Sequence, residues 1–85
     1  MSTDEIQSKV KQYLLEEFLP GAGEDELDDT TPLISGGILD SISVTRVVAF
    51  LEETFGVVFE AHEMGADYID TLGDIASLVA SKQAA

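Results

Sequence analysis

The most regular feature of the sequence is the recurrence of apolar residues at the spacing of an α-helix. Along residues 3–19 the apolar positions lie four, three, one and four residues apart, which places them on one helical face. Ser2 and Glu5 fit the S-x-x-E capping box at the start, and Pro20 marks the end. The face predicted to be buried consists of Ile6, Val10, Tyr13, Leu14 and Phe18.

Two later stretches repeat this pattern. Residues 41–55 are expected to form a second helix that ends at Gly56, because glycine readily adopts the left-handed conformation that closes a helix. The last helix is expected to begin near Thr71, whose hydroxyl can cap it, and to fray over residues 82–85. The predicted buried faces are Val44, Val47, Val48, Leu51 and Phe55 in the second helix, and Leu72, Ile75, Ala76 and Val79 in the last.

The segments between these helices have no sustained period. Residues 20–39 contain glycine and proline and are predicted to form a long first loop, which its own apolar residues attach to the core. Residues 57–59 are expected to form a buried connector, and residues 60–64 a short extra helix. The prediction is therefore an all-α bundle of three principal helices plus a short one. The apolar loop residues are Leu27, Leu33, Ile34, Ile38 and Leu39.

Composition limits the class of protein. A chain of 85 residues is expected to form one domain over residues 1–85, and its 45% hydrophobic content is too high for a disordered acidic tail. The sequence has no cysteine, which excludes disulfides and thiol nucleophiles and agrees with a reducing compartment. It shows neither a leader pattern nor an apolar run that could span a membrane, so we expect a cytoplasmic protein.

The charge is strongly negative, at −13 from 4 Lys+Arg and 17 Asp+Glu. Such a field repels nucleic acid and anionic membranes and attracts proteins with basic patches. Five acids lie within residues 24–29, but an EF-hand starting at Glu24 would require glycine at Asp29 and glutamate at Ser35. We therefore expect a solvated acidic surface there, with no metal bound.

Few residues are suited to catalysis. The G-x-S-x-G pattern of hydrolases and the G-x-x-x-x-G-K-[ST] phosphate loop are both missing from the sequence. His62 is the only histidine, and its acidic neighbours favour a surface imidazole over a catalytic base. Asp40 and Ser41 at the start of the second helix are ordinary capping residues. The unpaired N–H groups there also suit a phosphate, so Ser41 is a candidate phosphate-ester site.

One stripe of the second helix lies opposite its buried face. At about 100° per residue, Ile42, Arg46, Ala49 and Glu53 share this outer face and are predicted to meet solvent or a partner. Capping does not explain an isoleucine beside Ser41, and its position favours contact with the loop or with a partner.

Three segments together resemble the acyl carrier and peptidyl carrier protein family, which has a D-S-[LIM] motif at the start of its second helix. They are Leu39-Asp40-Ser41-Ile42 after a glycine-containing loop, residues 52–56 and residues 71–75, in a match that covers nearly the whole chain. The resemblance implies an acyl-carrier-type helical bundle in which Ser41 receives 4′-phosphopantetheine from coenzyme A. Acyl, aminoacyl or polyketide intermediates would be held as thioesters on that arm, whose thiol would account for the absent cysteine.

The resemblance also implies a monomer whose partners are a phosphopantetheinyl transferase, a loading enzyme and a downstream synthase or transferase with basic docking patches. Asp40 would help position the serine hydroxyl or the metal-bound coenzyme A, and Ile42 would be an apolar contact for these enzymes. Fatty-acid members usually have acidic residues just after the motif, where this chain has Ser43 and Arg46. Arg46 would weaken pairing with basic enzymes, which favours a specialised free-standing carrier over the housekeeping one.

Two other interpretations are open on the residues alone. An unmodified acidic helical adaptor would bind a basic protein through the second helix. A hydrolase would use Ser41 with His62. Incubation with coenzyme A and a transferase distinguishes the carrier from both, because the carrier alone gains mass.

Overall fold

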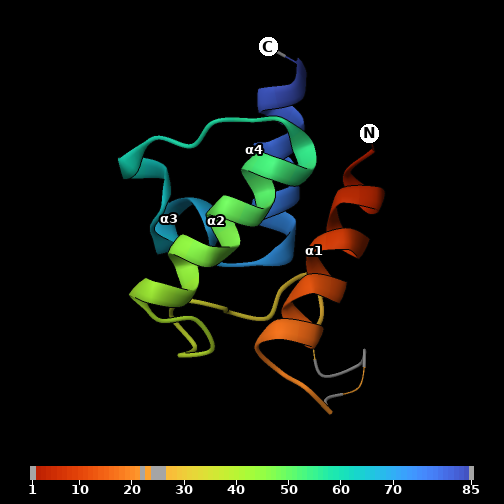
Figure 1. Ribbon diagram of the computed structural model, residues 1–85, viewed down its shortest axis with the longest axis vertical. Helices are drawn as coiled ribbons and strands as arrows, with labels where there is room; N and C mark the ends of the chain where they lie inside the picture. Colours follow the sequence, from red (N-terminus) through yellow and green to blue (C-terminus); the bar gives the residue numbers. More distant parts are fainter. Residues whose placement is uncertain (1, 22, 24–26, 85) are drawn as a thin grey trace.

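The computed structural model describes residues 2–21, 23 and 27–84, and the regular elements of this part of the chain are all helical, as predicted (Figure 1). The helix α4 is central, because α1, α2 and α3 all pack against it. In the view of Figure 1, α2 crosses in front of α4, with α1 on one side and α3 on the other. The elements are α1 (Thr3–Glu17), α2 (Ser41–Phe55), the 3-10 turn η2 (Ala61–Glu63), α3 (Ala66–Ile69) and α4 (Leu72–Ala84).

The start of α1 is as predicted, because the Ser2 hydroxyl accepts the Glu5 N–H at 3.3 Å. The helix ends at Glu17, two residues before the predicted end at residue 19. Pro20 accounts for the exclusion of residue 19, because proline disfavours the helical conformation in the residue that precedes it. The N–H groups of residues 18 and 19 both turn back to the Leu14 carbonyl, at 2.9 and 3.1 Å.

The bounds of α2 coincide with those predicted. Asp40 caps the first turn, and Gly56 ends the helix in the left-handed conformation at φ 68°. All five residues of its predicted inner face are buried: Val44, Val47, Val48, Leu51 and Phe55.

The long first loop is attached to the core by its own apolar residues, as expected. Leu27, Leu33 and Leu39 are buried, while Ile34 and Ile38 are half-buried and pack against the core. Residues 24–26 of the acidic run lie outside the described residues. Asp28, in the part of that run which the structure describes, accepts hydrogen bonds from Thr30 and Thr31.

Two expectations for the segment after α2 were wrong in part. Residues 57–59 are not buried throughout, because Val58 is 76% exposed while its two neighbours face the core. This alternation is that of an extended chain, whose successive side chains point to opposite sides. The short helical turn predicted over residues 60–64 is present as η2, but α3 follows it and was not predicted.

The helix α4 is capped as expected, since the Thr71 hydroxyl accepts the Asp74 N–H at 3.0 Å. The fraying predicted over residues 82–85 was wrong for residues 82–84, because α4 stays helical through Ala84, and residue 85 lies outside the described residues. Lys82 explains this, since its Nζ lies 2.7 Å from Glu63 Oε1 and above the Phe59 ring, so the last turn is tied to the segment after α2. No helix in the part of the chain described by the structure has the length and apolar character to cross a membrane.

Candidate functional site

Ser41 is the first residue of α2 and is exposed. The Asp40 carboxylate accepts the Ser43 N–H at 2.8 Å, and the Thr45 hydroxyl donates to the Ser41 carbonyl at 3.0 Å. These contacts hold the backbone on both sides of Ser41. Among residues 2–21, 23 and 27–84, no hydrogen bond engages the Ser41 hydroxyl itself, so it is open to a reagent from outside.

The Asp40 carboxylate is a capping group rather than a base. The backbone N–H and then the hydroxyl of Ser43 interact with it and lower the pKa of its carboxyl. A carboxylate with a lowered pKa holds a proton poorly. Asp40, the carboxylate next to Ser41 in the sequence, is therefore a poor base for the Ser41 hydroxyl.

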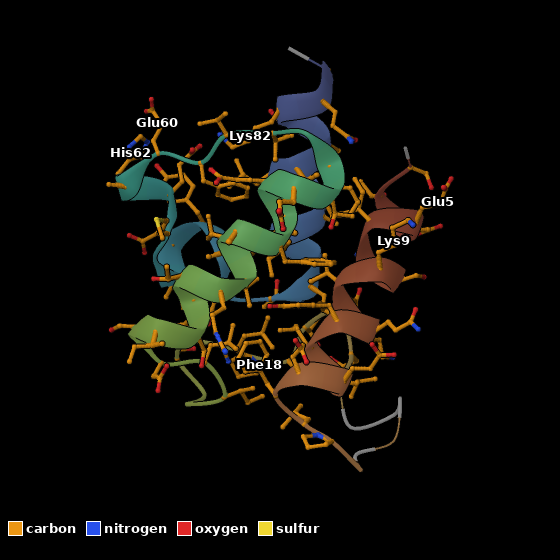
Figure 2. The ribbon with its side chains drawn as sticks, viewed as in Figure 1. Glu5, Lys9, Phe18, Glu60, His62 and Lys82 are labelled. Atoms are coloured by element: carbon orange, nitrogen blue, oxygen red, sulfur yellow. The ribbon has the colours of Figure 1, made fainter. Side chains whose placement is uncertain are left out.

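His62 belongs to a different part of the surface, as predicted for a lone imidazole. Its Nδ1 lies 3.7 Å from a Glu60 carboxylate oxygen, and its ring meets Tyr68 edge-on with centroids 5.7 Å apart. Figure 2 shows His62 and Glu60 at η2, away from the lower left of the view where α2 begins in Figure 1. The geometry does not pair His62 with Ser41 as a hydrolase requires.

The loop that leads into Ser41 is shaped by close backbone contacts. A side chain at Gly36 would collide with the Pro32 carbonyl oxygen, so glycine is required there. Gly37 has a φ of 83°, which L-residues with a side chain rarely adopt. Its N–H donates to the Ile34 carbonyl at 3.1 Å, and the Leu39 N–H donates to the Leu33 carbonyl at 2.9 Å.

A hollow of about 470 Å³ opens beside Ser41, and we call it the Ser41 hollow. An exposed hydroxyl at a helix N-terminus suits a phosphate ester, and the adjoining hollow can take the start of an attached chain. The residues therefore fit a phosphopantetheine group. The hollow is lined by Ile34, Leu39, Asp40, Ser41, Val44, Thr45 and Met64.

The predicted outer face of α2 faces away from the core. Ile42 is 75% exposed, and Arg46, Ala49 and Glu53 are exposed as well. Within the described residues, no carboxylate lies within ion-pair distance of Arg46. The ring of Tyr13 from α1 stacks on Phe50 at 4.0 Å beside this face, and its hydroxyl donates to the Arg46 carbonyl at 3.4 Å.

Comparison with known proteins agrees with this geometry. The family model described as "Phosphopantetheine attachment site" matches residues 12–79. The chain belongs to this family. It is also 27% identical over 78 residues to a protein named "Acyl carrier protein" from Chlamydia caviae, across 92% of this chain and 96% of that protein.

Membership of the phosphopantetheine-attachment family settles the cofactor and the general role. The family is defined by a covalently attached 4′-phosphopantetheine, and its acyl carrier members are carriers rather than catalysts. The thiol of the attached group supplies the chemistry, by holding intermediates as thioesters. The adaptor that carries no prosthetic group is not favoured by these comparisons.

Sequence reasoning missed several residues around Ser41. Thr45 lies one helical turn after Ser41, and that spacing was sufficient to place it at the site. Ile34 was expected only to attach the loop, yet it also lines the Ser41 hollow. Met64 and Asp70 had no local signal, because each reaches this region through long-range packing.

Proposed function

We propose that the protein is a carrier whose 4′-phosphopantetheine arm is attached to the hydroxyl of Ser41. The observation that carries this assignment is the exposed Ser41 hydroxyl at the first position of α2, next to the Asp40 cap and the Ser41 hollow. The positive end of the helix favours a phosphate at this position, while the Ser43 N–H of the first turn is taken by the Asp40 cap.

The neighbouring serines are less suitable acceptors. The Ser35 hydroxyl is engaged, because it donates to Asp70 Oδ2 at 2.6 Å. Ser43 is half-buried, and its N–H donates to the Asp40 carboxylate at 2.8 Å. Ser41 therefore combines exposure with a hydroxyl that has no partner among the described residues.

Attachment is a phosphoryl transfer from coenzyme A. The Ser41 Oγ forms a new bond to the phosphorus next to the pantetheine, and the bond from that phosphorus to the adenosine bisphosphate breaks. The hydroxyl proton passes to a base of the transferase, because Asp40 is a weak base. The chain contributes an accessible, oriented hydroxyl and a positive helix end.

Intact mass spectrometry after incubation with coenzyme A and a phosphopantetheinyl transferase tests this assignment. The unaltered protein and the Ser43→Ala and Ser35→Ala variants should each gain one phosphopantetheine mass. Ser41→Ala should gain none while keeping the same helical circular dichroism. A full yield of adduct in Ser41→Ala would refute the assignment, and no adduct in any variant would favour the unmodified adaptor.

The carrier is proposed not to catalyse a reaction itself. It is proposed to serve a specialised acyl, aminoacyl or polyketide pathway. Arg46 supports the specialised pathway, because it presents a positive charge on the outer face of α2, where acidic residues would attract basic enzymes. Loading assays with fatty-acid synthesis enzymes test it. Slow turnover compared with an acidic fatty-acid carrier is expected, and equal turnover would contradict the specialised role.

The proposed partners are the transferase, a loading enzyme and a downstream synthase or transferase. The net charge of −13 favours basic docking patches on these enzymes. Asp40, Ile42, Ala49 and Glu53 are proposed to contact them together with Arg46, because all five residues are exposed along one side of α2 or at its start.

A further inference from the structure

Asp70 lies between the end of α3 and the start of α4, and it is half-buried. Its Oδ1 accepts the N–H groups of Ile34 and Ser35, both at 2.8 Å. Its Oδ2 accepts the Ser35 hydroxyl at 2.6 Å, and its backbone carbonyl accepts the Leu33 N–H at 2.6 Å. One residue thus accepts four hydrogen bonds from three consecutive residues of the loop before α2.

The segment that Asp70 holds is linked to Ser41 through buried and hydrogen-bonded residues. Leu33 is fully buried, and its carbonyl accepts the N–H of Leu39, which is only 3% exposed. Asp40 comes next and caps α2, and Ser41 follows it. A shift of Leu33 would therefore move the start of the helix.

Asp70 also connects two segments that line the Ser41 hollow. Ile34, whose N–H it accepts, and Met64, between η2 and α3, are both lining residues. Because Asp70 follows directly after α3, its carboxylate holds the loop at Ile34 to the short helix that begins after Met64. The shape of the hollow depends on this connection.

We propose that Asp70 is a positioning residue for Ser41. By fixing the segment Leu33–Ser35 it sets the orientation in which a transferase meets the hydroxyl, although Asp70 itself contacts neither Ser41 nor the hollow. Hydrogen bonds to an ionised carboxylate are stronger than those between neutral groups, so one such residue can order a loop that lacks secondary structure. This inference rests on the proposed attachment at Ser41.

The ionisation of Asp70 agrees with this role. The hydrogen bonds from the Ser35 hydroxyl, the Ser35 N–H and the Ile34 N–H lower the pKa of its carboxyl, in that order of effect. The group is therefore a carboxylate at neutral pH. An asparagine would still accept the two N–H groups through its amide oxygen, whereas an alanine would accept neither.

Steady-state kinetics of phosphopantetheine transfer test the proposal with three variants. Asp70→Ala should lower kcat about tenfold, because a misplaced reacting group lowers the rate at saturation. Asp70→Asn should recover most of that loss. Asp67→Asn is the matched control, because it removes the same charge from an exposed position on α3, and its kcat should not change. A merely structural role would reduce the concentration of folded acceptor, which raises the apparent KM and leaves kcat unchanged.

Amide hydrogen exchange in the unmodified protein gives a second readout that does not depend on transfer. In Asp70→Ala the Ile34 and Ser35 N–H groups should exchange at least tenfold faster, while Val47 inside α2 keeps its protection. If Asp70→Ala does not fold, Ser35→Ala should still lower kcat about twofold, because it removes one of the four bonds. The proposal would be overturned by an unchanged kcat in folded Asp70→Ala, by an unchanged kcat in Ser35→Ala where Asp70→Ala does not fold, or by unchanged exchange at Ile34 and Ser35 in folded Asp70→Ala.

The failure of the two proposals can be distinguished. If the unaltered protein gains no phosphopantetheine at Ser41, the proposed function fails. If it is modified and the Asp70 variants match it in kcat, attachment at Ser41 stands and the positioning role of Asp70 is wrong.

Discussion

The two faces of α2 differ in composition and in what they contact. Every residue of the inner face is apolar and at most 7% exposed, whereas the outer face combines Ile42 at 75% exposure with a cation, an anion and an alanine. The uniform inner face binds the helix to the core, so it determines stability. The mixed outer face contributes little to packing, so it is available for recognition. Substitutions on the two faces should consequently have separable effects.

The largest effect is expected on the inner face. Leu51 is fully buried, and Leu51→Ala should lower the free energy of unfolding by about 2–5 kcal/mol, because it leaves a cavity. A domain of this size has a total stability of roughly 4–13 kcal/mol, so the loss is severe. Urea denaturation measures it, with Glu53→Ala on the outer face as a control expected to change by less than about 0.5 kcal/mol. Equal losses in the two variants would contradict the distinction between the faces.

The next largest effect is expected from Ile42→Asp, which should change the interaction with partner enzymes but not the stability. Ile42→Asp should leave the unfolding transition within about 0.5 kcal/mol of the original, because the side chain is exposed. It should reduce loading by partner enzymes at least tenfold, because it removes an apolar anchor and places a charge in a desolvated contact.

Val58→Asp is the matched control for Ile42→Asp. Val58 is 76% exposed, similar to Ile42, but it lies after α2 and off the outer face. Its substitution should leave loading unchanged. If Val58→Asp impaired loading as much as Ile42→Asp, general apolar exposure rather than the outer face of α2 would govern docking.

A smaller effect is expected from reversing the charge at Arg46. Arg46→Glu should preserve helicity and Ser41 modification, raise turnover with fatty-acid synthesis enzymes a few-fold and lower loading by the native partner. The size follows from the roughly 0.2–1 kcal/mol of an exposed ion pair. Arg46→Gln separates the loss of the cation from the gain of an anion and should give intermediate rates. If neither substitution altered the rates with either class of enzyme, Arg46 would have no role in partner choice.

The smallest effect is expected at the N-terminal cap of α2, which belongs to neither face. The lowered pKa of Asp40 means that its ionised form stabilises the fold. This contribution is fully present above the ordinary carboxyl pKa of about 4. It is lost as the pH falls through the lower pKa that Asp40 has in the folded protein. Asp40→Asn still caps the helix but does not titrate. Thermal melts should therefore show a higher Tm for the unaltered protein at pH 7 and a narrowing difference below pH of about 4. A difference that is independent of pH would show that the charge of Asp40 does not matter.

The sequence predicts local features of this molecule well. The bounds of α2 follow from Asp40, Gly56 and an apolar period that runs through the whole helix, all of which act within a few residues of each other. The same is true of the Thr71 cap of α4. The exposed position of Ser41 at the start of α2 follows for the same reason, whereas its assignment as the attachment site comes from the family resemblance and stays a prediction.

Features that depend on distant contacts were not predictable. The helix α3 has four residues, which is too short to show a period. It forms between Gly65 and Asp70, the residue that is hydrogen-bonded to the first loop. The last turn of α4 was expected to fray because the sequence does not reveal that Lys82 has a partner. That partner, Glu63, lies 19 positions away. The hydrogen bonds of Asp70 reach 35 and 36 positions back along the chain, and no spacing within the sequence indicates them.

The central claim is that Ser41 carries the prosthetic group, and locating the added mass within the modified protein tests it most directly. Fragmentation of the holo protein by tandem mass spectrometry should place phosphopantetheine on Ser41, between fragment ions that break on either side of this residue. Ser35 and Ser43 are internal controls in the same region and should be unmodified. An adduct on Ser43 or Ser35, with Ser41 unmodified, would contradict the account.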